Sequence, residues 1–256
     1  MLGNSARLNY AHSAMRYDIR RFSSVTSTMD VCRGLAEQGA PEGVVVLADE
    51  QTTGRGRAGR AWYSPAGQSL YLSLLLRPSL APRQLSWLTM IGALAVLDAL
   101  GELHIPPSRA GLKWANDVLL DGRKLAGILV EAAFAADRLE YAVLGIGLNV
   151  NTRFEDAPAA VRAQAISLQQ AMGRPFDLQT VLDLLLAAFD ERYAQLPASP
   201  LPAYVARLET LGRRVCLRSG DEELIGIATR VEDDGTLIVS TSSGERRVAF
   251  GDLLSA

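Results

Sequence analysis

The segment that most constrains the fold alternates between two kinds of residue. Residues 144–151 read Leu-Gly-Ile-Gly-Leu-Asn-Val-Asn. Side chains of a strand alternate between its two faces, so one face here would be aliphatic and the other would be bare backbone followed by two amides. Glycines inside a strand often mark the close approach of a ligand. We therefore predict a core strand with a ligand on its glycine face; the alternative is a glycine-rich bulge.

Both helical and strand periods occur along the chain, which predicts an α+β fold. The runs 44–48 and 70–76 are apolar enough to be buried strands, and residues 83–100 have the spacing of an amphipathic helix. A capping box at 27–30 predicts a helix that ends near Gly39. Further strands are expected near 112–114, 118–120, 124–134 and 140–150, and further helices at 157–171, 178–194 and 201–210.

The chain changes character near Gly212. With 256 residues, of which 48% are hydrophobic, it can bury one sizeable core and a small satellite domain. Beyond Gly212, short β runs are separated by turn signals such as Asp234-Gly235, which is typical of a small β-barrel or sandwich. Residues 1–14 lack periodicity and are expected to be a flexible tail. We therefore divide the chain into residues 1–14, 15–211 and 212–256.

Residues 54–60 read Gly-Arg-Gly-Arg-Ala-Gly-Arg and predict an anion-binding loop. Glycine lets the backbone approach a ligand closely, and the forked arginine side chain matches carboxylates and phosphates. The three glycines also match a dinucleotide fingerprint, but that pattern must open a helix, and Pro65 disfavours one here. A solvated basic hairpin remains the alternative, because arginines are mostly exposed.

Two further segments place polar groups beside expected strands. Residues 113–117 read Lys-Trp-Ala-Asn-Asp, in which Asn116 and Asp117 are either ligand-binding groups or plain turn formers. Lys124 opens an apolar strand directly after Asp121-Gly122, a hairpin signal. A lysine at that place is either part of a site or a guard of the sheet edge.

The composition excludes several classes of function. The formal net charge of −2 argues against a general nucleic-acid binder, which needs a basic surface. Apolar runs are too short for a membrane span or a secretory signal. Cys32 and Cys216 lie far apart, as in a reduced cytoplasmic protein. The two histidines, His12 and His104, are too few for a histidine-rich metal site.

In combination, these segments resemble the biotin protein ligases, also called biotin–[acetyl-CoA-carboxylase] ligases. The resemblance covers about residues 15–256 and implies a mixed-sheet catalytic domain of the class II synthetase/biotin ligase type, followed by a small C-terminal SH3-like β-barrel. It rests on Ser27-Thr28, Gln51, Gly54 to Arg60 with Trp62, Lys113-Trp114-x-Asn116-Asp117, Arg123 to Glu131, and Gly145-x-Gly147-x-Asn149, in the family's order.

The resemblance implies a reaction in two steps. Biotin would attack the α-phosphorus of ATP to give biotinyl-5′-AMP, which stays non-covalently bound, and a lysine of a biotin carboxyl carrier domain would then attack this mixed anhydride. It also implies that Lys124 and Arg57 are catalytic and that Asp117 holds Mg²⁺. The implied biotin site comprises Ser27, Thr28, Met29, Gln51, Arg55, Gly56, Arg57, Lys124, Gly127 and Gly147. The implied nucleotide site comprises Arg57, Arg60, Trp62, Asn116, Lys124 and Asn149.

The sequence departs from the family pattern at two positions. Met29 stands where the family usually has Asn and removes an amide near the expected biotin ring. Ala115 stands where the family usually has Pro and removes no functional group.

The loop at 54–60 is expected to be mobile without ligand and to close over the acyl-adenylate.

Three alternatives stay open: a lipoate or octanoate ligase, a DNA-binding repressor, and an inactive biotin-binding module, against which the intact Arg57, Asp117 and Lys124 argue. A lipoate or octanoate ligase has a related fold, although the segments around Gln51 and Lys113 favour biotin. The related octanoyl transferases use a cysteine thiolate, whereas we expect both cysteines here to be packing residues. A DNA-binding repressor would need an N-terminal winged helix, for which the residues before Ser27 are too few. We therefore expect a cytoplasmic monomer or homodimer that binds neither nucleic acid nor membrane.

Overall fold

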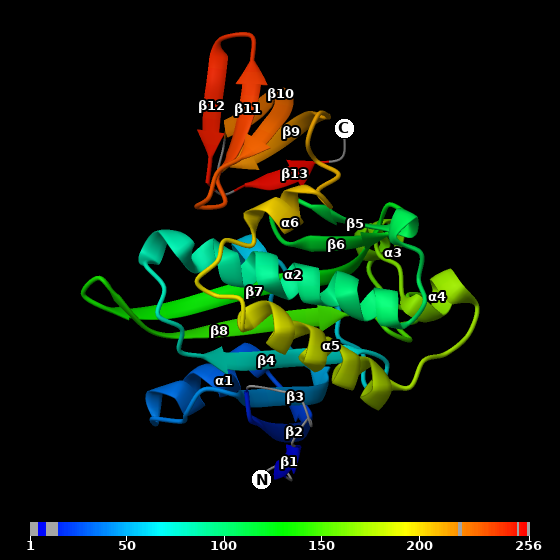
Figure 1. The fold of residues 1–256 in the computed structure, drawn as a ribbon. Helices are drawn as coiled ribbons and strands as arrows, with labels where there is room; N and C mark the ends of the chain where they lie inside the picture. The colour runs from blue at the N-terminus through cyan, green and yellow to red at the C-terminus, as the bar shows by residue number, and fades with distance from the viewer. Residues whose placement is uncertain (1–4, 9–14, 220–221, 250, 255–256) are drawn as a thin grey trace.

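The computed structural model describes residues 5–8, 15–219, 222–249 and 251–254, which form two sheets and the helices around them. The larger sheet has eight strands in the order β1-β2-β3-β4-β8-β7-β6-β5 (Figure 1). In it β2 and β3 are parallel and the other described pairs are antiparallel, so the sheet is mixed as expected. Its strands are β1 (Ser5–Leu8), β2 (Tyr17–Val25), β3 (Val44–Gln51), β4 (Leu70–Leu76), β5 (Ala110–Lys113), β6 (Asp117–Leu120), β7 (Arg123–Ala135) and β8 (Arg138–Leu148).

Helices cover the two faces of this sheet unequally. The long helices α2 (Leu85–Glu102) and α5 (Leu178–Tyr193) lie together on one face, as Figure 1 shows. Helix α1 (Thr28–Glu37) packs on the opposite face, against the alternate residues of β3 and β4. The shorter helices are α3 (Ala159–Gln164), α4 (Leu168–Met172) and α6 (Leu201–Val205), and the 3-10 turns are η1 (Arg57–Gly59), η2 (Pro82–Gln84) and η3 (Pro107–Arg109).

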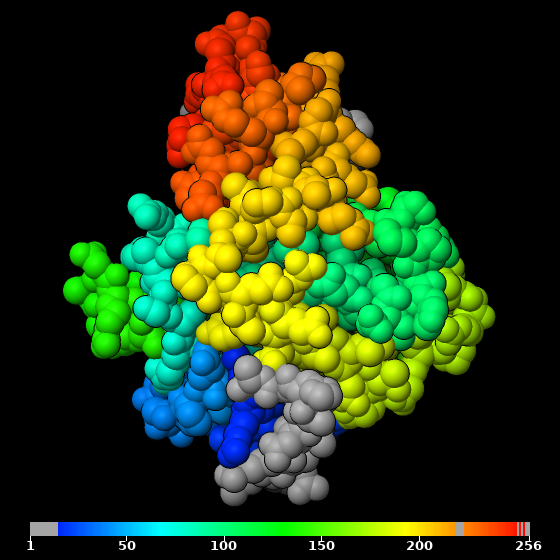
Figure 2. All heavy atoms as spheres, viewed as in Figure 1, coloured from blue at the N-terminus to red at the C-terminus, as the bar shows by residue number. Residues whose placement is uncertain are grey.

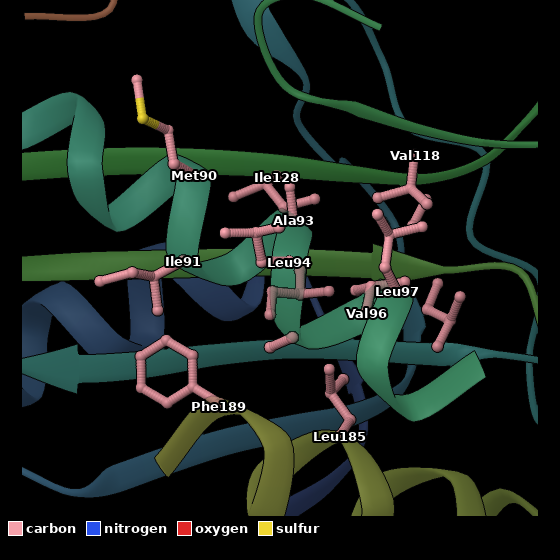
Figure 3. Close-up of a cluster of buried hydrophobic side chains, with 14 of the residues drawn as sticks. Met90, Ile91, Ala93, Leu94, Val96, Leu97, Val118, Ile128, Leu185 and Phe189 are labelled. Carbon is pink, nitrogen blue, oxygen red and sulfur yellow. The ribbon is translucent and has the colours of Figure 1, made fainter. Parts of the chain in front are cut away.

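Helix α2 is buried nearly all round, which differs from the amphipathic helix expected at 83–100. Its side chains pack against Ile128 of β7 on one side and against Leu185 and Phe189 of α5 on the other (Figure 3). Residues 82–102 are long and apolar enough to cross a membrane by composition alone, but 67% of the most apolar window is buried inside the protein, as in a core helix. The apolar composition of α2 therefore follows from its place between the sheet and α5.

Several expected elements are found at their predicted places. Strands occupy 44–48 and 70–76, and α1 begins after the N-cap Ser27, whose Oγ accepts from Met29 N. The hairpin at Asp121-Gly122 joins β6 to β7, and both residues have positive φ, of 51° and 72°. This is the backbone of a type I′ turn, which favours the Asp-Gly pair.

Two expected helices are shorter than predicted, and two strands were not expected. The helix at 157–171 is interrupted at Ala165, because Lys124 O accepts a hydrogen bond from Ile166 N and draws the backbone into an extended conformation. The helix at 201–210 ends at Val205. Strand β2 was missed, and β1 lies within the expected tail at 1–14, whose other residues lie outside the described ones.

The smaller sheet is antiparallel and has the strand order β12-β11-β10-β9-β13. An SH3-like barrel is not confirmed, because β12 and β13 form opposite edges and no closed barrel is seen within the described ranges. Figure 2 shows this sheet as a lobe standing on the rest of the molecule. Its strands are β9 (Arg214–Ser219), β10 (Glu222–Val231), β11 (Leu237–Thr241), β12 (Gly244–Val248) and β13 (Asp252–Leu254).

Candidate active site

A pocket of about 360 Å³ lies on the face of the large sheet that carries α1. Its walls come from the start of α1, the end of β3, the loop at 55–63, strands β7 and β8, and the segment 154–165. Every predicted site residue except Asp117 lines it: Ser27, Thr28, Met29, Gln51, Arg55, Gly56, Arg57, Arg60, Trp62, Asn116, Lys124, Gly127, Gly147 and Asn149.

Neutral polar groups form one part of the pocket lining. Thr28 donates through both its N–H and its Oγ1 to Gln51 Oε1, over 2.9 and 3.1 Å. Ser73 Oγ, fully buried on β4, donates to Thr28 Oγ1 over 2.8 Å, and Gln51 Nε2 donates to Ser64 Oγ over 3.1 Å. The chain Ser73–Thr28–Gln51–Ser64 thus fixes polar atoms at a buried wall, where they can recognise an uncharged polar ring.

The glycine face of β7 and β8 is covered by an indole. A Cβ added to Gly147 would lie 2.5 Å from Trp62 Cε2, and one added to Gly127 would lie 2.8 Å from Trp62 Cζ3. Only glycine therefore leaves room for Trp62 at these two positions. At Gly145 an added Cβ would lie 2.9 Å from the Met29 sulfur, so Met29 packs on the same face.

The side chain of Lys124 extends between Trp62 and Asp117. Its Nζ lies 2.6 Å from Asp117 Oδ1 and 5.3 Å from the centre of the Trp62 ring. Asp117 does not line the pocket, although its ion pair places it directly behind Lys124. An ammonium group is a compact charge, which suits a position between two anionic reactants.

Arg57 is held by the turn that contains Trp114 and Asn116. Its Nη1 donates to Asn116 Oδ1 over 3.1 Å, and its guanidinium lies 5.9 Å from the centre of the Trp114 ring. Asn116 Nδ2 donates in turn to Ile128 O over 2.8 Å, which fixes the amide. These two hydrogen bonds in series thus orient a permanent positive charge at the pocket wall.

The loop at 54–60 is a compact hairpin. Gly56 N donates to Arg60 O over 2.7 Å, and Trp62 N donates to Gly54 O over 2.8 Å. Ala58 has φ 52° within η1, which lets the chain reverse. The Arg55 guanidinium contacts two carboxylates, Asp30 of α1 at 3.0 Å and Glu131 of β7 at 3.2 Å.

Asn149 contacts backbone in this structure. Its buried Nδ2 donates to Ile166 O over 3.2 Å and to Lys124 O over 3.4 Å, so the amide ties β8 to β7 and to the segment after α3. Its backbone N also donates to Leu125 O. The predicted contact with a nucleotide would have to use the remaining Asn149 oxygen.

Sequence reasoning missed part of the pocket wall. Phe154, Val161 and Gln164 close the pocket from the segment around α3. Ser64 and Ser73, which do not line the pocket themselves, complete the polar chain through Gln51 and Thr28. Alternation along β4 could have placed Ser73 on the same face as Tyr71, which lines the pocket. No local sequence pattern predicts that the segment 154–165 lines the pocket.

Neither cysteine belongs to the pocket. Cys32 is fully buried on α1, and burial raises the pKa of its thiol to about 12, so the group is protonated at neutral pH. Cys216 lies on β9 in the smaller sheet. Both are free thiols, and neither lines the pocket, so the arrangement supplies no thiolate nucleophile there.

The residues that the structure describes include no group of three His, Cys, Asp or Glu side chains that could hold a metal ion. Asp117 Oδ1 is buried, and its partner among the described residues is the Lys124 ammonium group at 2.6 Å. One such carboxylate fits Mg²⁺, which is often held by one or two carboxylates together with substrate phosphates.

Two family models match the chain. Residues 21–149 match the biotin/lipoate A/B protein ligase family, and residues 210–253 match the biotin protein ligase C-terminal domain. The first match begins within β2 and ends at Asn149 of the pocket. The second coincides with the smaller sheet.

Similar proteins agree with these models. A biotin–[acetyl-CoA-carboxylase] ligase of Paracoccus denitrificans is 38% identical over 81% of this chain and 88% of its own length. A bifunctional ligase/repressor of Bacillus subtilis is 33% identical over 90% of this chain and 71% of its own length. Among solved structures, the biotin protein ligase of Aquifex aeolicus in complex with biotin and ATP has a TM-score of 0.74 at 30% identity and covers 92% of this chain and 97% of its own.

Proposed function

Because the chain belongs to the biotin/lipoate A/B protein ligase family, we propose that its pocket joins biotin to AMP and passes the biotinyl group to a lysine of a carrier protein. The chain is accordingly a biotin protein ligase that uses biotin and ATP. The observation that carries the proposal is the pocket itself, in which Thr28 and Gln51 of the neutral polar chain and four cationic side chains line the same cavity.

The first step brings two anions together, so the protein must offset their repulsion. The biotin carboxylate attacks the α-phosphorus of ATP, the bond to the β-phosphate oxygen breaks, and pyrophosphate leaves. Lys124 supplies a compact charge between carboxylate and phosphate, and Arg57 and Arg60 supply charge along the phosphates. Such preorganised cations stabilise charge that develops in the transition state.

The neutral part of the pocket positions the vitamin ring. Ser27, Thr28 and Gln51 offer hydrogen bonds to the ureido group, and Met29 with the glycine face packs on its apolar atoms. Trp62, Asn116 and Asn149 belong to the adenylate half. Holding both substrates in line converts a bimolecular step into an effectively unimolecular one.

Asp117 would hold Mg²⁺, which would neutralise charge on the phosphates of ATP. Its buried oxygen is paired with the Lys124 ammonium group, so it would be open to the metal ion once Lys124 turns toward substrate. Arg55 and Gly56 bring the loop to the biotin side, where its closure excludes water from the mixed anhydride.

The second step needs no nucleophile from this chain. The acceptor lysine attacks the acyl carbon of biotinyl-5′-AMP, an amide forms, and AMP leaves. The acceptor is a biotin carboxyl carrier domain, as the names of the relatives suggest. The buried Cys32 thiol, protonated at neutral pH, fits a route without an acyl-enzyme.

Other expectations remain part of this proposal. We place the domain boundary between residues 211 and 212 and assign the smaller sheet to the SH3-like class, supported by the separate sheets and the two family matches. The free thiols fit a reducing, cytoplasmic setting. The net charge of −2 fits a protein that does not bind nucleic acid. We further propose that the protein is a monomer or a homodimer.

The function is tested by ATP–pyrophosphate exchange with biotin and with lipoate in parallel. We expect exchange with biotin; exchange with lipoate alone would show that the substrate assignment is wrong. Lys124→Ala should lower the biotin-dependent rate by about 100-fold or more, because it removes the charge at the reacting atoms. Arg230→Ala is the control, since Arg230 is exposed on β10 of the smaller sheet and does not line the pocket.

A further inference from the structure

The turn at 113–117 is held by residues from the C-terminal part of the chain. Trp114 is 4% exposed, and its Nε1 donates to Gly235 O of the smaller sheet over 2.9 Å. Its backbone N donates to Thr210 Oγ1 over 3.0 Å. Both donors of Trp114 are therefore taken by groups that follow residue 205, outside the large sheet.

Two further contacts hold the same turn. Tyr204, which is 1% exposed, donates its hydroxyl to Ala115 O over 3.0 Å. Lys113 Nζ donates to Leu253 O of β13 over 3.1 Å. Three consecutive residues of the turn are thus bound by groups spread over residues 204–253.

The turn at 113–117 in turn contacts Arg57 through Trp114 and Asn116. The face of the Trp114 ring lies 5.9 Å from the guanidinium, and Asn116 Oδ1 accepts from Arg57 Nη1 over 3.1 Å. Arg57, Trp114 and Gly235 also line one small cavity of about 180 Å³ behind the active-site pocket. A cation is attracted to the face of an indole ring and not to its edge, so the orientation of the Trp114 ring influences the position of the Arg57 guanidinium.

The orientation of the indole is set by its N–H. A buried N–H without an acceptor destabilises the protein by the full desolvation free energy of the group. The Trp114 indole therefore keeps its N–H directed at Gly235 O while the smaller sheet is docked. Trp87 donates its own Nε1 to Asp233 O of the same 233–236 turn over 2.7 Å, but it contacts neither pocket.

We propose that Trp114 is a positioning residue through which the smaller sheet sets the place of Arg57 for the adenylation step. This inference rests on the proposed function, in which Arg57 acts on the phosphates of ATP. It assigns the C-terminal sheet a part in the first half-reaction, although none of its residues lines the active-site pocket among those described.

The test compares Trp114→Phe with Trp87→Phe in the full chain. Each variant removes one indole N–H bonded to the same 233–236 turn, and only the first also changes the support of Arg57. Biotin-dependent ATP–pyrophosphate exchange is measured against ATP concentration, and biotin affinity is measured by equilibrium dialysis. For Trp114→Phe we expect kcat/KM for ATP to fall about tenfold, the equivalent of one lost hydrogen bond, with biotin affinity within about twofold of wild type.

Trp87→Phe should keep both values within about twofold of wild type, while thermal unfolding shows a similar loss of stability in the two variants. Tyr204→Phe gives a second variant, with a severalfold fall in kcat expected at unchanged biotin affinity. An equal fall in both tryptophan variants, or equal weakening of biotin and ATP by Trp114→Phe, would overturn the role of Trp114. Wild-type protein without biotin-dependent exchange would instead refute the proposed function.

Discussion

At the scale of single residues, two glycines decide the shape of the active site. Gly127 and Gly147 face each other on β7 and β8, and the Trp62 indole occupies the space that their side chains would fill. Alternation in the sequence is enough to predict a bare glycine face, because strand side chains alternate. It does not predict that Trp62 covers this face, since the return path of a loop is set by tertiary contacts.

Gly147→Ala should therefore displace Trp62 and disturb the adenylate half of the site. We expect kcat/KM for ATP in the exchange reaction to fall about tenfold or more, because misplacement by 1 Å can cost about 100-fold. The measurement is steady-state exchange together with the quenching of tryptophan fluorescence by substrate. Gly101→Ala on α2 is the control, since an added Cβ there meets nothing within 4 Å. Equal rates for Gly147→Ala and wild type would contradict this packing role.

At the scale of elements, the loop at 54–60 is anchored to two carboxylates that do not line the pocket. Arg55 contacts Asp30 and Glu131, and Arg33 contacts the same two carboxylates. These side chains are 31–41% exposed, so the network adds little to global stability. It nevertheless joins the loop to α1 and β7, which both line the pocket.

Glu131→Gln should loosen the loop and leave the fold intact. We expect faster tryptic cleavage after Arg57 or Arg60, and a change in unfolding free energy below about 1 kcal/mol, since partly exposed pairs contribute that little. Added salt should raise the cleavage rate of wild type toward that of the variant. Glu245→Gln, which breaks a pair with Arg230 on the smaller sheet, is the control. Cleavage that is the same in Glu131→Gln and Glu245→Gln would exclude the anchor.

Some helices and strands can be predicted from the local sequence pattern, and others cannot. Strands β3 and β4 and helix α5 follow from local pattern and from caps such as Asp177, whose side chain accepts from Thr180 N. The break at Ala165 could not be predicted, because it depends on a bond between Ile166 and Lys124, far apart in sequence. Segments held by such contacts carry the pocket residues that sequence reasoning missed.

At the scale of the whole molecule, the two sheets are joined through buried tryptophans. Trp87 and Trp114 both donate to the 233–236 turn, and Val215 and Leu237 of the smaller sheet belong to the main hydrophobic core. The sequence predicts two sheets from the change in pattern near Gly212. Their docking could not be predicted, because indole donors and backbone acceptors meet only after folding.

Since the core runs through both sheets, thermal unfolding should be a single cooperative transition. Calorimetry should give equal calorimetric and van't Hoff enthalpies, and tryptophan fluorescence should change together with far-ultraviolet circular dichroism. A separate transition of the smaller sheet at lower temperature would contradict this coupling. Saturating biotin should raise the midpoint, because a ligand that binds only the folded state stabilises it.

The chain contains only two lysines, Lys113 and Lys124, and both ammonium groups are engaged, with Leu253 O and with Asp117. Its other permanent cations are arginines, which stay protonated and therefore cannot be acylated at neutral pH. Among its side chains, an enzyme that makes a reactive acyl donor thus exposes that donor to only two amines of its own. Self-labelling of side chains is therefore limited to two positions, and an acceptor lysine has few competitors.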